Sequence, residues 1–181
     1  MKDVFLIIKI TIIGLLVAVF VYPIVHESGH IISTILTGGR FIKLSWIPTP
    51  NILCEVNSTN TTALAIINLS GMILPIVFIM PFYKTKGFIR FGALIFCMII
   101  ILSAVIGLIV SIISCFGINV SNDDVTSFIE FSGWLLPTIL IMIAMIGISA
   151  FQLMRFKPVE TIDCILSISV YKNKSITTSH I

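Results

Sequence analysis

The sequence predicts an all-α polytopic membrane protein, with about four transmembrane helices and a short β-hairpin between the first two. Hydrophobic residues make up 57% of the 181 residues and charged residues only 10%, and the mean hydropathy is +1.15. Soluble domains contain about 45–50% apolar and about 25% charged residues. Apolar runs of about 20 residues or more, enough to cross about 30 Å of hydrocarbon, recur along the chain. We therefore expect a multi-pass integral protein of a lipid bilayer, the cell membrane of a prokaryote.

Four apolar runs carry the expected helices, over residues 4–36, 62–83, 88–116 and 127–156. The first run is too long for one straight crossing. Pro23 lacks a backbone N–H and predicts a kink or local opening just before residue 26.

The ends of these runs set the expected domain limits. Gly38-Gly39 predicts the end of the first helix, because glycine adopts the left-handed conformation of helix C-caps. Residues 1–156 form the expected transmembrane domain, and residues 157–181 form a polar, basic tail. Within the tail, residues 162–171 favour a strand.

Residues 40–61 differ from the helical runs. From Ile42 to Trp46, apolar and polar residues alternate with the period of a strand that has one wet face. The following Pro48-Thr49-Pro50-Asn51 is typical of a turn, and residues 52–56 can form the returning strand. We expect a hairpin here, with a plain loop as the alternative.

Charge and cysteine usage argue against two classes of function. The net charge is only +3, and the basic residues sit between apolar runs, so nucleic-acid binding has no support. The four cysteines are far apart and form no CxxC pair. Two of them lie in or beside apolar runs, which predicts buried thiols rather than a disulfide framework or a cysteine metal site.

The basic residues are also distributed unevenly about the expected helices. On a four-helix topology only Arg40 and Lys43 fall on one side, so the positive-inside rule places both termini in the cytoplasm. Eight basic residues share the other side: Lys2, Lys84, Lys86, Arg90, Arg155, Lys157, Lys172 and Lys174.

A five-residue motif, HESGH, interrupts the first apolar run. His26 and His30 are four residues apart, which puts both imidazoles on one helical face. That spacing lets two neutral imidazoles bind one Zn²⁺ ion, while Glu27 can take a proton from a metal-bound water. An ionisable side chain within a membrane helix costs about 2.5–3.5 kcal/mol, which disfavours chance. We assign His26 and His30 as zinc ligands and Glu27 as the catalytic base.

A catalytic zinc site needs a third protein ligand. On the expected topology, Asp123 and Asp124 lie between the third and fourth helices, on the same side as HESGH. One of them could instead cap the fourth helix. We prefer Asp124 as the ligand because it lies four residues before Phe128 and shares a face of the starting helix with it. Asp123 and Glu130 are the alternatives.

The second helix brings further polar and small residues to the expected depth of the zinc. Gly71 would allow close helix approach. Asn68 could bind substrate by donating to its carbonyl or to the developing oxyanion, and a polar helix–helix contact is the alternative.

These features resemble the site-2 protease family of intramembrane zinc metalloproteases. In that family HExxH lies on a transmembrane helix, and an aspartate from a later helix supplies the third ligand. The resemblance includes Thr37-Gly38-Gly39, Asn68-Leu69-Ser70-Gly71 with Pro75, and Asn122-Asp123-Asp124, although the family's Asp-Gly motif is absent.

The resemblance implies a minimal member without a PDZ domain. Such an enzyme hydrolyses a peptide bond in or near a transmembrane segment of a substrate protein, in regulated intramembrane proteolysis. The alternative is a metal-binding membrane protein without proteolysis, such as a zinc transporter or sensor. A binder needs the histidines but not an unliganded carboxylate, so Glu27 favours the protease.

Overall fold

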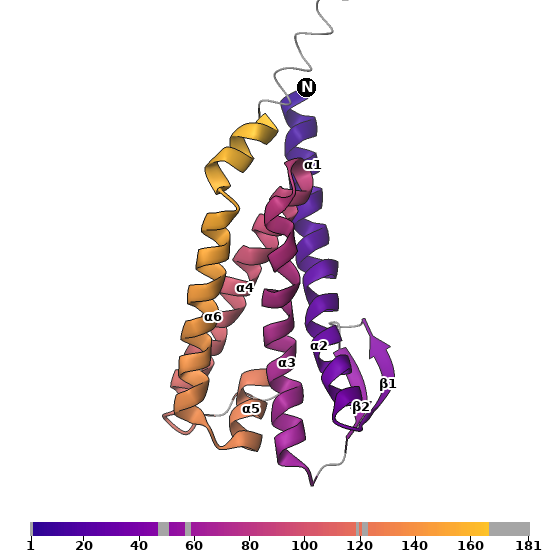
Figure 1. The fold of residues 1–181 in the computed structure, drawn as a ribbon, viewed down its shortest axis with the longest axis vertical. Coiled ribbons are helices and arrows are strands. Elements are labelled where there is room, and N and C mark those ends of the chain that lie inside the picture. Colours follow the sequence, from indigo (N-terminus) through magenta and orange to yellow (C-terminus); the bar gives the residue numbers. More distant parts are fainter. Residues whose placement is uncertain (1, 47–50, 57–58, 119, 121–122, 167–181) are drawn as a thin grey trace, which may run out of the picture.

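The chain forms a bundle of membrane-spanning helices with one hairpin (Figure 1). The computed structural model describes residues 2–46, 51–56, 59–118, 120 and 123–166. Among these residues, four helical segments are long and apolar enough to cross a membrane: 4–36, 61–84, 87–114 and 135–155. The elements in order are α1 (Lys2–Leu16), the π-helix η1 (Val17–Val21), α2 (Tyr22–Leu36), β1 (Arg40–Ser45), β2 (Asn51–Glu55), α3 (Thr61–Ile79), the 3₁₀-helix η2 (Met80–Lys84), α4 (Gly87–Ser114), α5 (Asp124–Ser132) and α6 (Leu135–Arg155).

The first membrane segment is one helix whose hydrogen-bond pattern changes in the middle. The π-helix η1 separates α1 from α2 and ends just before Pro23. Proline removes one helical hydrogen bond, and a π-turn is a common way for a helix to absorb such a defect. The change in hydrogen-bond pattern thus lies at residues 17–21, ahead of the predicted position, and residues 22–26 are α-helical. At the far end Gly38 has φ +82°, and the Gly39 N–H donates to the Thr34 carbonyl at 2.8 Å, so the predicted glycine cap is confirmed.

The predicted hairpin is also confirmed. Strands β1 and β2 pair antiparallel, from Arg40 opposite Glu55 to Ser45 opposite Asn51, with an irregularity between Phe41 and Lys43. The hairpin runs back along α2 rather than away from it (Figure 1). Near its tip the Trp46 ring lies 6.1 Å from the ring of Phe20, which belongs to η1. Strand β2 therefore lies beside the helix that carries HESGH.

The predicted single helix over residues 127–156 is wrong. It is two helices, α5 and α6, that meet at Gly133. Gly133 has φ +71°, and its N–H closes α5 on the Ile129 carbonyl at 2.8 Å. A long apolar run concealed this break, because one glycine in the left-handed conformation is enough to end a helix.

The strand predicted over residues 162–171 is wrong in its described part. Residues 158–166 are helical, and Thr161 and Ile165, four residues apart, are both buried on one face. Residues 167–171 lie outside the described part of the chain.

The two ends of the bundle differ in charge. We call the end with the hairpin and α5 the metal end, because it contains the predicted metal ligands, and it lies at the bottom of Figure 1. The opposite end holds the N-terminus, η2 and the end of α6. We call it the basic end, after the five described residues Lys84, Lys86, Arg90, Arg155 and Lys157. Arg40 and Lys43 lie at the metal end, as predicted.

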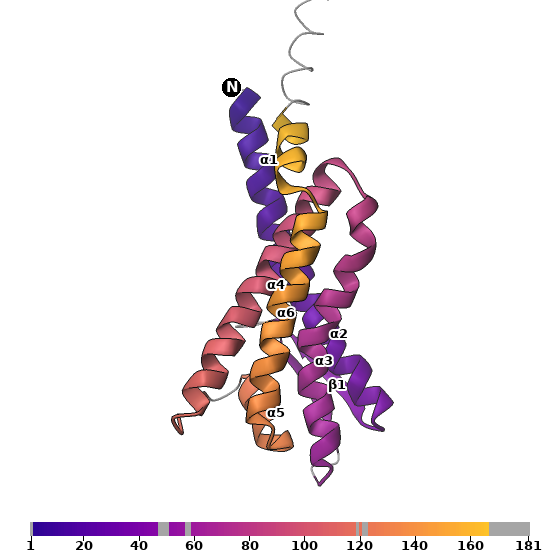
Figure 2. The same cartoon turned by 60° about the vertical axis from the view of Figure 1, so that its left-hand side comes forward.

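Toward the metal end α4 moves away from α2 and α3, as Figure 2 shows. At the level of η1, α4 still packs on the first helix through the ring of Phe96, which contacts Tyr22 edge-on at 5.5 Å between centroids. Helix α5 occupies part of the space between α3 and α4 below that contact (Figure 1). The divergence opens the cavity in which the polar residues gather.

Candidate metal centre

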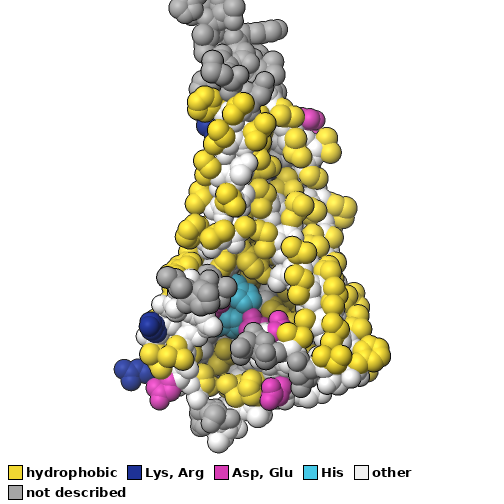
Figure 3. All heavy atoms as spheres, turned by 180° about the vertical axis from the view of Figure 1, so that it is seen from behind, with side chains coloured by type: hydrophobic (Ala, Val, Ile, Leu, Met, Phe, Trp, Pro, Cys, Tyr) yellow, Lys and Arg dark blue, Asp and Glu magenta, His cyan; other side chains and the backbone are white. Residues whose placement is uncertain are grey.

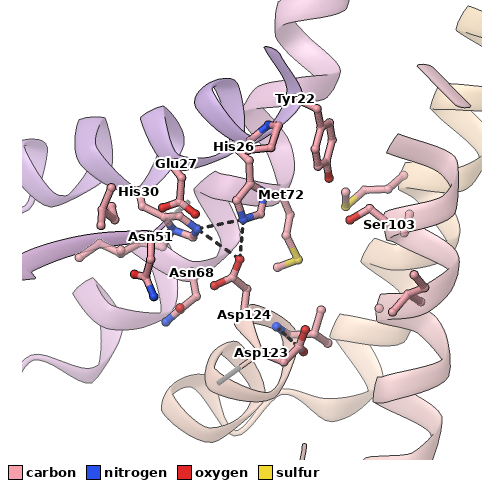
Figure 4. Close-up of a pocket in the computed structure, with 18 of the residues that line it drawn as sticks. Tyr22, His26, Glu27, His30, Asn51, Asn68, Met72, Ser103, Asp123 and Asp124 are labelled. Atoms are coloured by element: carbon pink, nitrogen blue, oxygen red, sulfur yellow. Dashed lines mark hydrogen bonds and ion pairs between the residues drawn. The ribbon is translucent and has the colours of Figure 1, made fainter. Parts of the chain in front are cut away.

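Three metal-ligating side chains from distant parts of the sequence converge at the metal end (Figure 4). The Asp124 Oδ2 atom lies 2.8 Å from His26 Nε2 and 3.2 Å from His30 Nε2, and the two Nε2 atoms are 3.2 Å apart. His26 and His30 lie on α2, one turn apart, and Asp124 begins α5. These are the three residues that the sequence predicted as metal ligands.

Their separations fit one zinc ion. Ligands at tetrahedral angles and about 2.0–2.1 Å from zinc lie about 3.3–3.4 Å from each other. The three observed separations, 2.8 to 3.2 Å, are slightly shorter, as expected for atoms that hydrogen-bond to one another. Two imidazoles and one carboxylate also match the donor type of catalytic zinc sites.

A hydrogen bond fixes the orientation of His30. Its Nδ1 donates to the Ile67 carbonyl of α3 at 2.8 Å, and the side chain is almost fully buried. When the ring is neutral, this bond keeps the proton on Nδ1 and leaves the Nε2 lone pair free for a metal ion; when the ring is protonated, Nε2 can instead donate to Asp124. The contact is possible only because residue 71 is glycine, since a Cβ atom at Gly71 would overlap the His30 ring.

Helices α2 and α3 approach closely beside this site. A Cβ atom at Gly29 would lie 2.8 Å from the Cα of Gly71, too close for any real contact. The Ser70 hydroxyl donates to the Gly29 carbonyl at 2.9 Å, and the Ser33 and Ser70 hydroxyls are 2.6 Å apart. Small residues and interhelical hydrogen bonds are what hold helices together in a membrane. Close packing of α2 on α3 therefore positions His30.

The geometry distinguishes the three carboxylates that the sequence left open. Asp123 turns away from the histidines and caps α5, its Oδ2 accepting from the N–H groups of Val125 at 3.0 Å and Thr126 at 3.1 Å. Glu130 is exposed and does not line the cavity. Asp124 alone of the three contacts the histidines.

The ionised form of Asp124, the form that can bind a metal ion, is favoured over the protonated form. Burial alone would raise the pKa of its carboxyl group. The hydrogen bonds from the His26 and His30 rings outweigh burial and hold the pKa well below its usual range.

The centre lies in a cavity of about 840 Å³ that is lined by α2, β2, α3, α4, α5 and α6. Figure 3 shows the histidines at the bottom of a hollow in the surface, with acidic side chains beside them. Glu27 lies in this cavity next to the two histidines but is not one of the three converging groups (Figure 4). Its carboxylate interacts with the backbone N–H of Ile52 in β2. The hairpin thus borders the centre directly.

Asn68 lines the same cavity, as predicted. Its Nδ2 donates to the Leu64 carbonyl of its own helix at 2.8 Å. Among the described residues this is the only hydrogen bond of the Asn68 side chain, so its amide oxygen accepts from no described group. Asn68 therefore lies near the centre, and among the described residues its side chain forms no hydrogen bond to a neighbouring helix.

Sequence reasoning missed Tyr22. Its ring stacks on His26 with centroids 6.0 Å apart and lines the cavity, and its hydroxyl faces Ser103 of α4 (Figure 4). Tyr22 lies four residues before His26, on the same helical face. That spacing was a signal available in the sequence.

No protein-family model, no curated protein and no solved structure matches this chain. The chain is a multi-pass membrane protein in which two histidines and an aspartate form a group that could bind a metal ion.

Proposed function

We propose that this chain is a membrane-embedded zinc metalloendopeptidase, similar to the site-2 proteases, that cleaves a transmembrane protein substrate in or near its membrane segment. The observation that carries the proposal is the convergence of His26, His30 and Asp124 within hydrogen-bonding distance, with Glu27 beside them and outside the group. Three protein ligands and a neighbouring free carboxylate are the elements of a zinc hydrolase site.

Each residue has a distinct role in this reaction. His26, His30 and Asp124 would hold a zinc ion, which would supply Lewis-acid chemistry that polarises a carbonyl and activates water. Glu27 accepts the proton of the attacking water and returns it to the leaving amine. The backbone of Ile52 lies close enough to interact with the Glu27 carboxylate, so the base lies next to β2, the strand that would bind substrate.

The cavity suits an extended peptide. A helical substrate hides its carbonyl groups, so it must unwind before it can be cut. Residues 51–54 of β2 line the cavity, and within the described residues β2 pairs only with β1. An unwound segment could therefore add to β2 as a further strand, a common mode of peptide recognition.

A zinc transporter is less well supported. Transport needs a polar path from the site to the other end of the bundle. Between the centre and the basic end, the described core is mostly apolar, with Ile76, Ile79, Phe96 and Ile100 buried beside two polar side chains, Ser149 and Gln152. A hydrated or coordinated ion would have few polar partners there.

Metal analysis and cleavage of a model transmembrane substrate test the proposal together. The purified protein should hold about one zinc per chain. Glu27→Gln should retain the zinc and lose cleavage, because it removes the base and no ligand. Glu55→Gln, the same chemical change on an exposed residue of β2, should retain both.

Two results would contradict the proposal. Cleavage by Glu27→Gln at the wild-type rate would exclude Glu27 as the base. Zinc binding without cleavage of any membrane substrate would favour the sensor instead.

A further inference from the structure

Three cationic side chains lie at the basic end, far from the metal centre, and two of them lie over the ring of Tyr83. The Arg155 guanidinium lies over the Tyr83 ring, 4.3 Å from its centroid, and Lys84 Nζ lies 5.5 Å from the same centroid. Arg90 reaches the end of α6, where its Nη2 donates to the Arg155 carbonyl at 3.5 Å. The three charges come from η2, α4 and α6.

These cations lack an acidic partner in the described part of the chain. The ion pair at this end joins Lys157 to Glu160 and involves none of the three. The C-terminus of α6 supplies only about half a negative charge. Three clustered positive charges are therefore largely uncompensated, and their mutual repulsion favours a bound anion.

An apolar cleft of about 240 Å³ begins at the same place. Tyr83 and Arg155 lie at its rim, between η2 and α6. Apolar side chains form most of the rest of its lining: Ile79, Met80, Ile148, Phe151 and Phe156. The cleft thus joins a cationic mouth to an apolar interior along the surface of the bundle.

We propose that this cleft binds one anionic phospholipid. The phosphate would lie among Lys84, Arg90 and Arg155, and part of an acyl chain would lie in the cleft along α6. Tyr83 belongs at this level, since tyrosine side chains favour the boundary between lipid and water. A free phosphate would use only the mouth, whereas a lipid uses both parts, so a lipid is the ligand that fits. The site is independent of the metal centre and of its function.

Native mass spectrometry of the full chain in a mild detergent tests this site, with phosphatidylglycerol and phosphatidylcholine as probes. One phosphatidylglycerol per chain should be retained in preference to phosphatidylcholine. Arg155→Gln and Arg90→Gln should each weaken retention about fivefold, the effect of one basic residue at an anionic surface. Lys84→Gln, at an exposed side chain, should act in the same direction and provides a second variant if an arginine change destabilises the fold.

Lys86→Gln is the matched control, because it removes one charge at the same end, and among the described residues Lys86 neither contacts the Tyr83 ring nor hydrogen-bonds to α6. It should leave retention unchanged. An equal loss in Lys86→Gln would show general attraction to anionic lipid and overturn the site. Equal retention of phosphatidylcholine, or binding of glycerol 3-phosphate as tight as that of the lipid, would also overturn it.

Discussion

Helices α1 and α2 are two halves of one membrane-spanning helix, and they differ in what they contact. Only 6% of the most apolar window of this segment is buried in the bundle, against 44% in α3 and α4. In α2, by contrast, His30, Ser33 and Thr34 are all buried. The α1 half, which is mostly apolar, lies largely on the outside of the bundle where lipid would cover it, and the half that contains polar and small residues packs against protein.

The glycines of the two halves show why. Gly14 in α1 has an ordinary neighbour, the Ile95 side chain, 3.5 Å from a Cβ atom built on it. Gly29 in α2 lies against the backbone of α3. Apolar surface gives no driving force between helices in lipid, so close backbone approach and hydrogen bonds decide which segments associate. In this chain, small polar positions predict packing better than hydrophobicity does.

Removing a ligand from the α2 half should have the largest effect. His30→Ala or Asp124→Ala should lower zinc affinity by more than about 100-fold, the upper end of the loss caused by removing a supporting partner. Competition with a chelator measures this affinity. Lys9→Ala in the α1 half should leave it unchanged. Tight binding by His30→Ala would mean that the metal binds elsewhere.

Substituting the glycine of each half should have the next largest effect. Gly29→Leu should destabilise the bundle by about 1–3 kcal/mol or more, because the new side chain meets the α3 backbone. The shift should also weaken zinc binding, since α3 orients His30. Thermal unfolding in detergent measures the first effect. Gly14→Leu should be nearly neutral, and equal destabilisation by both changes would show that α1 is packed as tightly as α2.

Substituting Asp123 and Asp124 one at a time should distinguish helix capping from metal binding. Asp123→Ala should destabilise the protein by about 1 kcal/mol, the usual cost of losing a helix N-cap, and retain most of the zinc affinity. Glu130→Ala should change neither property. A greater loss of zinc in Asp123→Ala than in Asp124→Ala would reverse the roles assigned from the geometry.

The last test asks which half of the first membrane helix faces the cytoplasm, and its substitutions should perturb the protein least. Single cysteines at the exposed positions Lys86 and Glu130, in a chain without its native cysteines, mark the basic end and the metal end. The positive-inside rule predicts that an impermeant thiol reagent labels position 130 and not position 86 in intact cells. The reverse pattern would place the metal centre toward the cytoplasm, as in site-2 proteases.

Much of this arrangement is local in sequence and could be predicted. The lengths of apolar runs set the membrane helices, and the spacing of His26 and His30 puts two imidazoles on one face of whichever helix contains them. The alternation after Arg40 indicated the hairpin. Each of these signals depends on residues within a few positions of one another.

Other features depended on contacts between distant segments. The choice of Asp124 over Asp123 follows from how α5 sits against α2 and α3, because adjacent residues on a helix start point in different directions. The break at Gly133 depended on a turn that an apolar run conceals. The sequence alone thus determined the helices and the histidine pair. Tertiary packing decided which carboxylate joins the two histidines, because packing sets the rotation of one helix relative to another.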